Sequence, residues 1–146
     1  MKERICWSSG VALRLEDFCG EYDLRTVCKH PHTMGNETVA ANGFIALIEP
    51  GKKGWPHVPD YFLDKFYDIT HAHENKVFKP IDNFEATSRF LFTIPAVFIE
   101  GYAVQLPYFN LIKNAPGLKI AFSDKALLFK SGNQRGMIML LQGFQK

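Results

Sequence analysis

The sequence predicts an α+β fold of antiparallel sheets with two short helices on one side. Residues 118–122 alternate apolar with polar or small side chains, and turn residues at 123–125 and 131–136 separate them from two further apolar segments, which is typical of a strand meander. Helix signals recur ahead of strand patterns at 10–19 and 106–114, so each half reads as one helix followed by antiparallel strands. With 146 residues, 47% of them hydrophobic, we expect a single domain over 1–146.

The first half reads as strand, helix and strands. Ser8 and Ser9 are suitable N-caps, and the apolar residues from Val11 to Cys19 follow the 3.6-residue period up to Gly20. We expect strands at 4–7, 23–28 and 38–48, a turn at 30–36, and a tight turn or bulge at Asn42-Gly43.

The middle of the chain, around 50–90, reads as an irregular insertion. Its Pro- and Gly-rich start, 50–59, predicts a loop, and Pro59-Asp60 predicts the start of a short helix. The inward face of that helix would hold Phe62, Leu63, Phe66 and Ile69. Residues 70–89 are polar and predict irregular structure.

The second half repeats the order of the first. Strands are predicted at 91–99 and 102–105, and Pro107 suits the first turn of a helix that ends at 114–117. Leu118, Ile120 and Phe122 then alternate with polar or small residues. Turns at 123–125 and 131–136 would join the strands 118–122, 126–130 and 137–141.

Composition excludes several classes of protein. A net charge of +2 excludes a strongly basic coat for nucleic acid, and three cysteines (Cys6, Cys19 and Cys28) without a CxxC spacing favour reduced thiols over a disulfide scaffold. The N-terminus lacks a signal-peptide pattern, and the longest apolar run, 90–99, is too short to span a bilayer. We therefore expect a cytoplasmic protein that does not enter membranes.

The element order and two sequence segments resemble one domain of the DNA sliding clamp family, the beta subunit of bacterial DNA polymerase III and its phage and plasmid relatives. Residues 106–139 resemble the helix, strands and basic glycine-containing turn of a clamp domain, and 38–47 resemble the family's "VATDGHRLAL" strand. The resemblance implies a pseudo-duplicated, processivity-clamp-like domain without enzymatic activity or cofactor. It also implies a role in DNA replication or recombination, with duplex DNA, a peptide motif of a replication protein and further copies of the chain as partners.

The end of the chain corresponds to the segment that lines the clamp family's peptide pocket. The resemblance implies that Met137, Met139 and Leu141 form a partner-binding pocket, and flexible methionines suit a groove that accepts varied peptides. The alternative is that these residues belong to the core of the closing strand.

The clamp resemblance also implies basic residues that meet phosphates without reading sequence. The candidates are Arg14 and Lys113 on the two helices and Lys119, Lys130 and Arg135 in the meander. The alternative for the meander residues is an ordinary solvated face. A second hypothesis is therefore a small protein-interaction module on a clamp-like fold without DNA contact.

Two His-x-His pairs support a third hypothesis, a cupin-like metal-dependent enzyme. The pairs are His30/His32 and His71/His73, and on a strand the residues i and i+2 point the same way and can grip one ion. Both pairs fall in segments that read as turns or polar loop, where histidines are more often solvated. No nucleophile motif, P-loop or acid/base carboxylate pair is present, and Cys19 reads as an inert core thiol.

Overall fold

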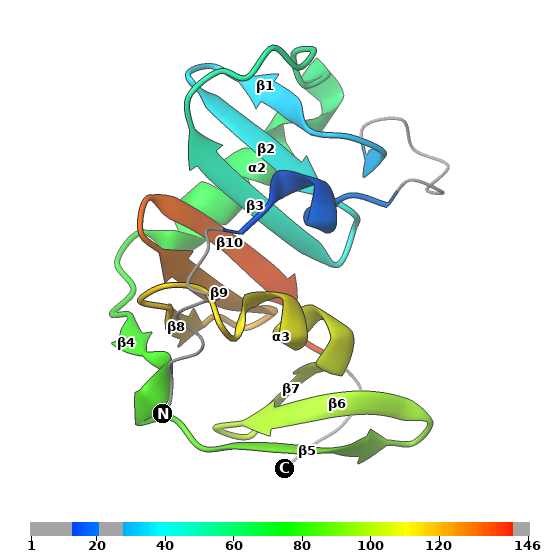
Figure 1. Cartoon of the computed structure of the whole chain (residues 1–146), viewed down its shortest axis with the longest axis vertical. Coiled ribbons are helices and arrows are strands. Elements are labelled where there is room, and N and C mark those ends of the chain that lie inside the picture. The colour runs from blue at the N-terminus through cyan, green and yellow to red at the C-terminus, as the bar shows by residue number, and fades with distance from the viewer. Residues whose placement is uncertain (1–12, 21–27, 142–146) are drawn as a thin grey trace.

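The structure is a computed structural model that describes residues 13–20 and 28–141 (Figure 1). Seven strands form one sheet in the order β1-β2-β3-β10-β9-β8-β4, and three form a second sheet in the order β5-β6-β7. All named strand pairs are antiparallel, which confirms the predicted α+β class. The elements are η1 (Leu15–Phe18), β1 (His32–Met34), β2 (Glu37–Ala41), β3 (Ile45–Pro50), α2 (Asp60–His73), β4 (Lys79–Pro80), η3 (Ile81–Asn83), β5 (Ala86–Leu91), β6 (Ile94–Ile99), β7 (Tyr102–Gln105), α3 (Leu106–Ile112), β8 (Lys119–Phe122), β9 (Ala126–Ser131) and β10 (Gln134–Met139).

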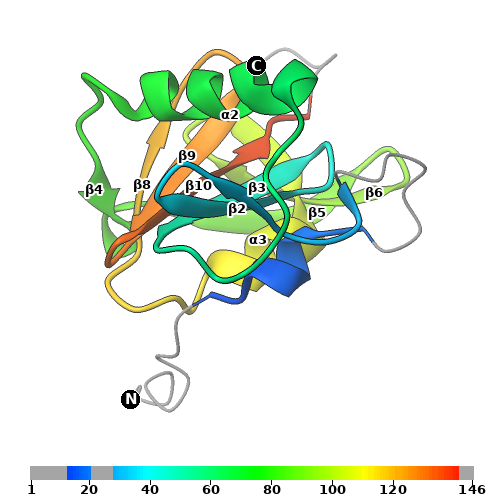
Figure 2. The same ribbon diagram turned by 90° about the horizontal axis from the view of Figure 1, so that it is seen from above.

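Helical segments cover both faces of the seven-stranded sheet (Figure 2). η1 and α3 pack on one face, in a cluster that contains Phe18, Ile112 and Phe129. α2 packs on the other face, where Phe66 joins Val39 of β2 and other apolar residues. The two α-helices, α2 and α3, therefore lie on opposite faces, so the prediction of two short helices on one side is wrong for them, and only the 3-10 turn η1 shares the face of α3. Within the described part of the predicted 10–19 helix, only one 3-10 turn forms.

The β2–β3 hairpin closes at Asn42-Gly43 as a tight turn. The Asn42 side-chain oxygen accepts hydrogen bonds from the backbone N–H groups of Phe44 (2.9 Å) and Ile45 (3.1 Å), and Gly43 takes a φ of 96° that favours glycine. The sequence left open whether Asn42-Gly43 forms a tight turn or a bulge. Ala41 pairs with Ala46 directly outside these residues, so the structure has the turn. β3 then lies beside β10, so the β2–β3 and β9–β10 hairpins are neighbours.

The second helix and the meander follow the prediction. Pro107 occupies the first turn of α3, and Phe109 and Ile112 are buried. β8, β9 and β10 form the antiparallel meander, with Ile120, Leu127 and Ile138 fully buried. Burying each such side chain stabilises the fold by about 1.5–3 kcal/mol. β10 begins three residues earlier than predicted, because Gln134 and Arg135 pair with the end of β9.

Residues 50–91 contain more regular structure than predicted. The loop 51–59 is fastened to β1, since the backbone N–H of Thr33 donates to Pro56 and that of Val58 donates to Thr33, both at 2.8 Å. α2 starts at Asp60 as predicted but continues to His73, and β4, η3 and β5 follow. The interpretation of 70–89 as irregular is therefore wrong, whereas the inward face of α2 is confirmed by Phe62, Leu63, Phe66 and Ile69. The turn predicted at 30–36 is likewise wrong in part, because β1 occupies 32–34.

The three-stranded sheet packs at one end of the molecule (Figure 1). Val97, Ile99 and Val104 join the cluster on the α3 face of the large sheet. Among the described residues, no helix combines the length and the apolar character needed to cross a bilayer. The predicted strand 4–7, the caps Ser8 and Ser9, Cys6 and most of 23–28 lie outside the described residues.

Candidate functional site

An open apolar groove lies between α2 and the large sheet. Its first section is a cavity of about 380 Å³. The sheet contributes Ala41, Gly43, Ile45, Ala46, Met137 and Met139, and α2 contributes Phe62, Lys65, Phe66, Asp68 and Ile69, with Lys125 at the rim. A second cavity of about 340 Å³ shares Asp68, Ile69, Lys125 and Met137 with the first. We call the two adjoining cavities the α2 groove.

The strand register explains why the groove forms at this place. Ala41, Ala46 and Met137 lie in one row across β2, β3 and β10. Ala41, Ala46 and Gly43 have small side chains or none, so the sheet side of the groove is low. Phe66 is buried against the neighbouring row of sheet residues and holds α2 above this low surface. A concave, mostly apolar space with a few polar groups beside it has the general character of a ligand site.

Two of the three predicted pocket residues line this groove. Met137 is half-buried in both cavities, and Met139 is 40% exposed at the first. Leu141 lies elsewhere, because its backbone N–H donates to the Ala103 carbonyl oxygen (2.8 Å) beside the small sheet. The structure therefore brings Met137 and Met139 together and leaves Leu141 out.

The five predicted phosphate-binding cations do not form one surface. Arg14 and Lys113 flank η1 and α3 on one face of the large sheet. Lys119, Lys130 and Arg135 lie in one row across β8, β9 and β10 on the α2 face. A single basic lining that includes all five residues is therefore not present, because the sheet separates the two groups.

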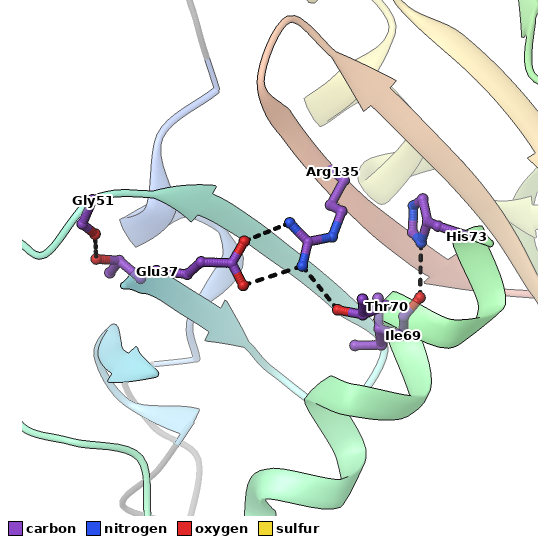
Figure 3. A network of polar contacts seen from close by, with 7 residues as sticks. Glu37, Gly51, Ile69, Thr70, His73 and Arg135 are labelled. Atoms are coloured by element: carbon purple, nitrogen blue, oxygen red, sulfur yellow. Dashed lines mark hydrogen bonds and ion pairs between the residues drawn. The ribbon is translucent and has the colours of Figure 1, made fainter. Parts of the chain in front are cut away.

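Arg135 is engaged within the fold (Figure 3). Its guanidinium donates to both carboxylate oxygens of Glu37 at 2.7 and 3.2 Å, and to the Thr70 hydroxyl at 2.8 Å. Bidentate pairing of this kind fixes orientation as well as adding energy. Arg135 thus ties β10, β2 and α2 together and holds one wall of the α2 groove.

His73 anchors the end of the same helix (Figure 3). Its Nδ1 lies 2.8 Å from the Ile69 carbonyl oxygen, and its Nε2 lies 3.3 Å from the Phe129 carbonyl oxygen. Burial lowers the pKa of His73 below its usual value of 6.5, and the nearby cations Arg135 and Lys130 act in the same direction. The residue is therefore a structural contact between α2 and β9.

The other histidines do not converge on a point. The His30 and His32 rings stack on each other at 4.6 Å, and His30 stacks on Trp55 at 5.4 Å. Burial, followed by the neighbouring His30, lowers the pKa of His32. His71 contacts Glu74 at 3.2 Å on the surface. Within 13–20 and 28–141, no group of three or more His, Cys, Asp or Glu side chains has the arrangement of a metal site.

The two described cysteines lie in protected positions. Cys28 is buried and Cys19 is half-buried. Burial, followed by the nearby carboxylate of Glu16, raises the pKa of the Cys19 thiol to about 11. Cys19 is therefore a poor nucleophile, in line with its interpretation as an inert thiol.

The sequence did not indicate that α2 forms one wall of the groove. The apolar face of α2 was visible in Phe62, Phe66 and Ile69, but its position above Met137 depends on tertiary packing. Comparison of the chain with protein-family models, curated proteins and solved structures finds no match.

Proposed function

We propose that this chain is a non-enzymatic, clamp-like interaction module whose α2 groove binds an apolar segment of a partner protein. The open groove with Met137 and Met139 in its lining carries the proposal. Unbranched thioether side chains adapt to different ligand shapes, which suits a surface that accepts short peptides. By the sequence resemblance, the partner would be a replication or recombination protein.

The strand order supports the clamp-like, pseudo-duplicated interpretation. η1 precedes β1, β2 and β3, and α3 precedes β8, β9 and β10. In the large sheet the first set runs β1-β2-β3 and the second continues as β10-β9-β8, so the last strands of both sets meet. Two helix-led halves that join through their final strands are what the resemblance implies.

The lining of the groove indicates the chemistry of its ligand. Apolar side chains from α2 and β10 would desolvate one or two large apolar anchors of the peptide. Lys65 and Lys125 lie at the rim together with Asp68 and Asp124. The rim therefore carries both signs of charge, and polar residues that flank the anchors would set the orientation of the peptide.

Selection from a random peptide library tests this function. We expect enriched peptides to share apolar anchors, and Met139→Lys to weaken their binding at least tenfold because it places a charge in the groove. Val77→Lys is the matched control, since Val77 is 78% exposed and does not line the groove. Peptides that bind Met139→Lys as tightly as the wild type would contradict the proposal.

A DNA-binding role is a second candidate that one observation favours. Lys119 and Lys130 lie directly opposite each other across β8 and β9, and both are exposed. Their like charges repel at this spacing, and within the described ranges no carboxylate pairs with either. Phosphates bound one to each side chain would relieve that repulsion.

Fluorescence anisotropy with labelled duplex DNA at several salt concentrations tests this candidate. Converting Lys119 and Lys130 to glutamine should reduce the slope of log affinity against log salt by about 2, since each phosphate contact contributes about 0.9. Lys52→Gln is the control, because Lys52 is exposed in the loop 51–59 and lies outside β8 and β9. Absence of salt-sensitive binding by the wild type would remove DNA from the function and leave the protein-interaction module.

A further inference from the structure

The turn between β2 and β3 contains the only asparagine of the chain that precedes a glycine, Asn42-Gly43. In such a dipeptide the glycine nitrogen can attack the side-chain carbonyl carbon of the asparagine, because no Cβ atom shields that nitrogen. Gly43 is exposed, and its backbone N–H donates no hydrogen bond to the described residues. Solvent base can therefore reach this N–H group and remove its proton.

The hydrogen bonds of the Asn42 side chain favour the same attack. Its Oδ1 accepts hydrogen bonds from the backbone N–H groups of Phe44 at 2.9 Å and Ile45 at 3.1 Å. The bond from Phe44 closes a small ring, as in an Asx-turn, and this ring contains both reacting atoms, Asn42 Cγ and the Gly43 nitrogen. Attack on Cγ places negative charge on Oδ1, and two backbone donors aimed at that oxygen stabilise the charge in the manner of an oxyanion hole.

We propose that Asn42 is a site of deamidation. The Gly43 nitrogen loses its proton and bonds to Asn42 Cγ, the side-chain nitrogen leaves as ammonia, and a cyclic succinimide forms. Water then opens the succinimide at either carbonyl and yields aspartate or isoaspartate at this position. The reaction needs water alone as a co-reactant, and no atom is oxidised or reduced.

The site adjoins the α2 groove. Gly43 belongs to the groove lining, and the backbone N–H of Met139 donates to the Phe44 carbonyl oxygen at 2.8 Å. An aspartate at position 42 keeps a side-chain oxygen for the two N–H groups, so the turn should persist. Isoaspartate carries the main chain through the side-chain carbon atoms, which lengthens the turn and displaces Phe44 and with it Met139. The isoaspartate form therefore binds groove ligands less tightly, a consequence that rests on the proposed function, whereas the modification itself does not.

Peptide mapping by mass spectrometry after incubation at mildly alkaline pH tests the modification. Trypsin releases residues 30–52 as one fragment, which also contains Asn36 as an internal control. We expect Asn42 to convert at least about tenfold faster than Asn36, because the side chain of Glu37 shields the backbone nitrogen that follows Asn36 and the turn stabilises the charge on Asn42 Oδ1. Conversion of Asn42 should also be at least as fast in the folded chain as in the urea-unfolded chain at the same pH. An Asn42 that stays intact, or that converts more slowly in the folded chain, would overturn the proposal.

Separated forms of the protein test the effect on the groove. Chromatography isolates the isoaspartate form, and Asn42→Asp supplies the aspartate form. In NMR spectra, the backbone amide and methyl signals of Met139 should shift in the isoaspartate form and stay near those of the wild type in Asn42→Asp. Asn42→Ser is the control for incubation, because serine keeps an oxygen for the turn but forms no succinimide, so its spectrum should not change with time. Unchanged Met139 signals in the isoaspartate form would refute the link between the turn and the groove.

Library peptides that bind the groove give the last measurement. They should bind the isoaspartate form at least about tenfold more weakly than the unmodified protein. Equal binding would overturn the effect on the groove and leave the modification site in place. A library without any groove-binding peptide would contradict the proposed function alone, because peptide mapping and the Met139 signals need no ligand.

Discussion

Replacing Gly136 with alanine tests the packing at the centre of the large sheet. Gly136 lies in β10 between Leu47 of β3 and Phe129 of β9. A Cβ atom built there would come closer than 3.0 Å to the Ala46 carbonyl oxygen and to the Phe129 ring. Real Cβ atoms do not tolerate such contacts, so the neighbouring strand or the ring must move.

The structure predicts both the sign and the size of the effect. Where alanine fits, replacing a glycine usually stabilises a protein by about 0.4–1 kcal/mol through the unfolded chain. Overpacking a core costs about 1–3 kcal/mol. Because one opposing atom is a backbone oxygen that cannot rotate away, we expect Gly136→Ala to lower the free energy of unfolding by about 3 kcal/mol. At about 2–4 °C per kcal/mol for a chain of this size, the Tm should fall by about 6–12 °C.

Thermal and urea unfolding, followed by circular dichroism, measure this change. Gly132→Ala is the control, since Gly132 has a φ of 60° and no atom within 4 Å of the added Cβ. That variant should lose only about 1 kcal/mol, from the left-handed backbone alone. The packing argument fails if Gly136→Ala is as stable as the wild type, or if it loses no more stability than Gly132→Ala.

Three other predictions concern Phe92 in the turn between β5 and β6, Arg135 beside the α2 groove, and the buried His73. Phe92→Asn should raise the free energy of unfolding by about 1 kcal/mol, because asparagine tolerates the φ of 59°, and an unchanged or lower urea midpoint would show that the backbone is not strained. Arg135→Met should lower stability by about 2 kcal/mol, since Glu37 and Thr70 lose their charge-assisted contacts, and calorimetry of this variant beside Glu37→Gln checks it. Because the pKa of His73 is lowered in the folded chain, the unfolded chain binds the proton more readily. The free energy of unfolding should therefore be highest above pH 6.5, fall as the pH drops below 6.5, and level off below the folded-state pKa. Urea midpoints from pH 8 to pH 5 measure that fall, and His73→Gln should reduce it; an equal fall in the variant would assign the effect to other groups.

Local patterns carried most of the strand and helix predictions. Pro107, the alternation from Leu118 to Phe122 and the Asn42-Gly43 turn are signals that depend on neighbouring residues only, and the structure has the elements they predict. The inward face of α2 follows from the spacing of its apolar residues in the same way.

The errors arise where distant contacts decide the outcome. The last turn of α2 looks polar, yet His73 is buried there because its ring meets a carbonyl of β9, 56 positions away. β5 is exposed along almost its whole length, so it lacks the apolar alternation by which a strand is recognised. Its formation depends on pairing with β6.

The candidate site shows the same division. Met137 and Met139 could be selected from the sequence, but the low floor at Ala41 and Ala46 becomes meaningful only when β2, β3 and β10 align. Arg135 looks like a free surface cation until Glu37, 98 positions away, is placed beside it. Charge patterns along a chain cannot report such pairs.

The pairing of β3 with β10 has a consequence for how the chain reaches this structure. It joins Ile45 to Ile138, segments separated by about ninety residues, and it is the only contact between named strands that connects the β1–β3 set to the rest of the described sheet. Pairings that span so much sequence carry a large loop-closure cost and slow the search for the native topology. During synthesis, the hairpin from β2 and β3 would therefore keep the outer edge of β3 unpaired until β10 has left the ribosome.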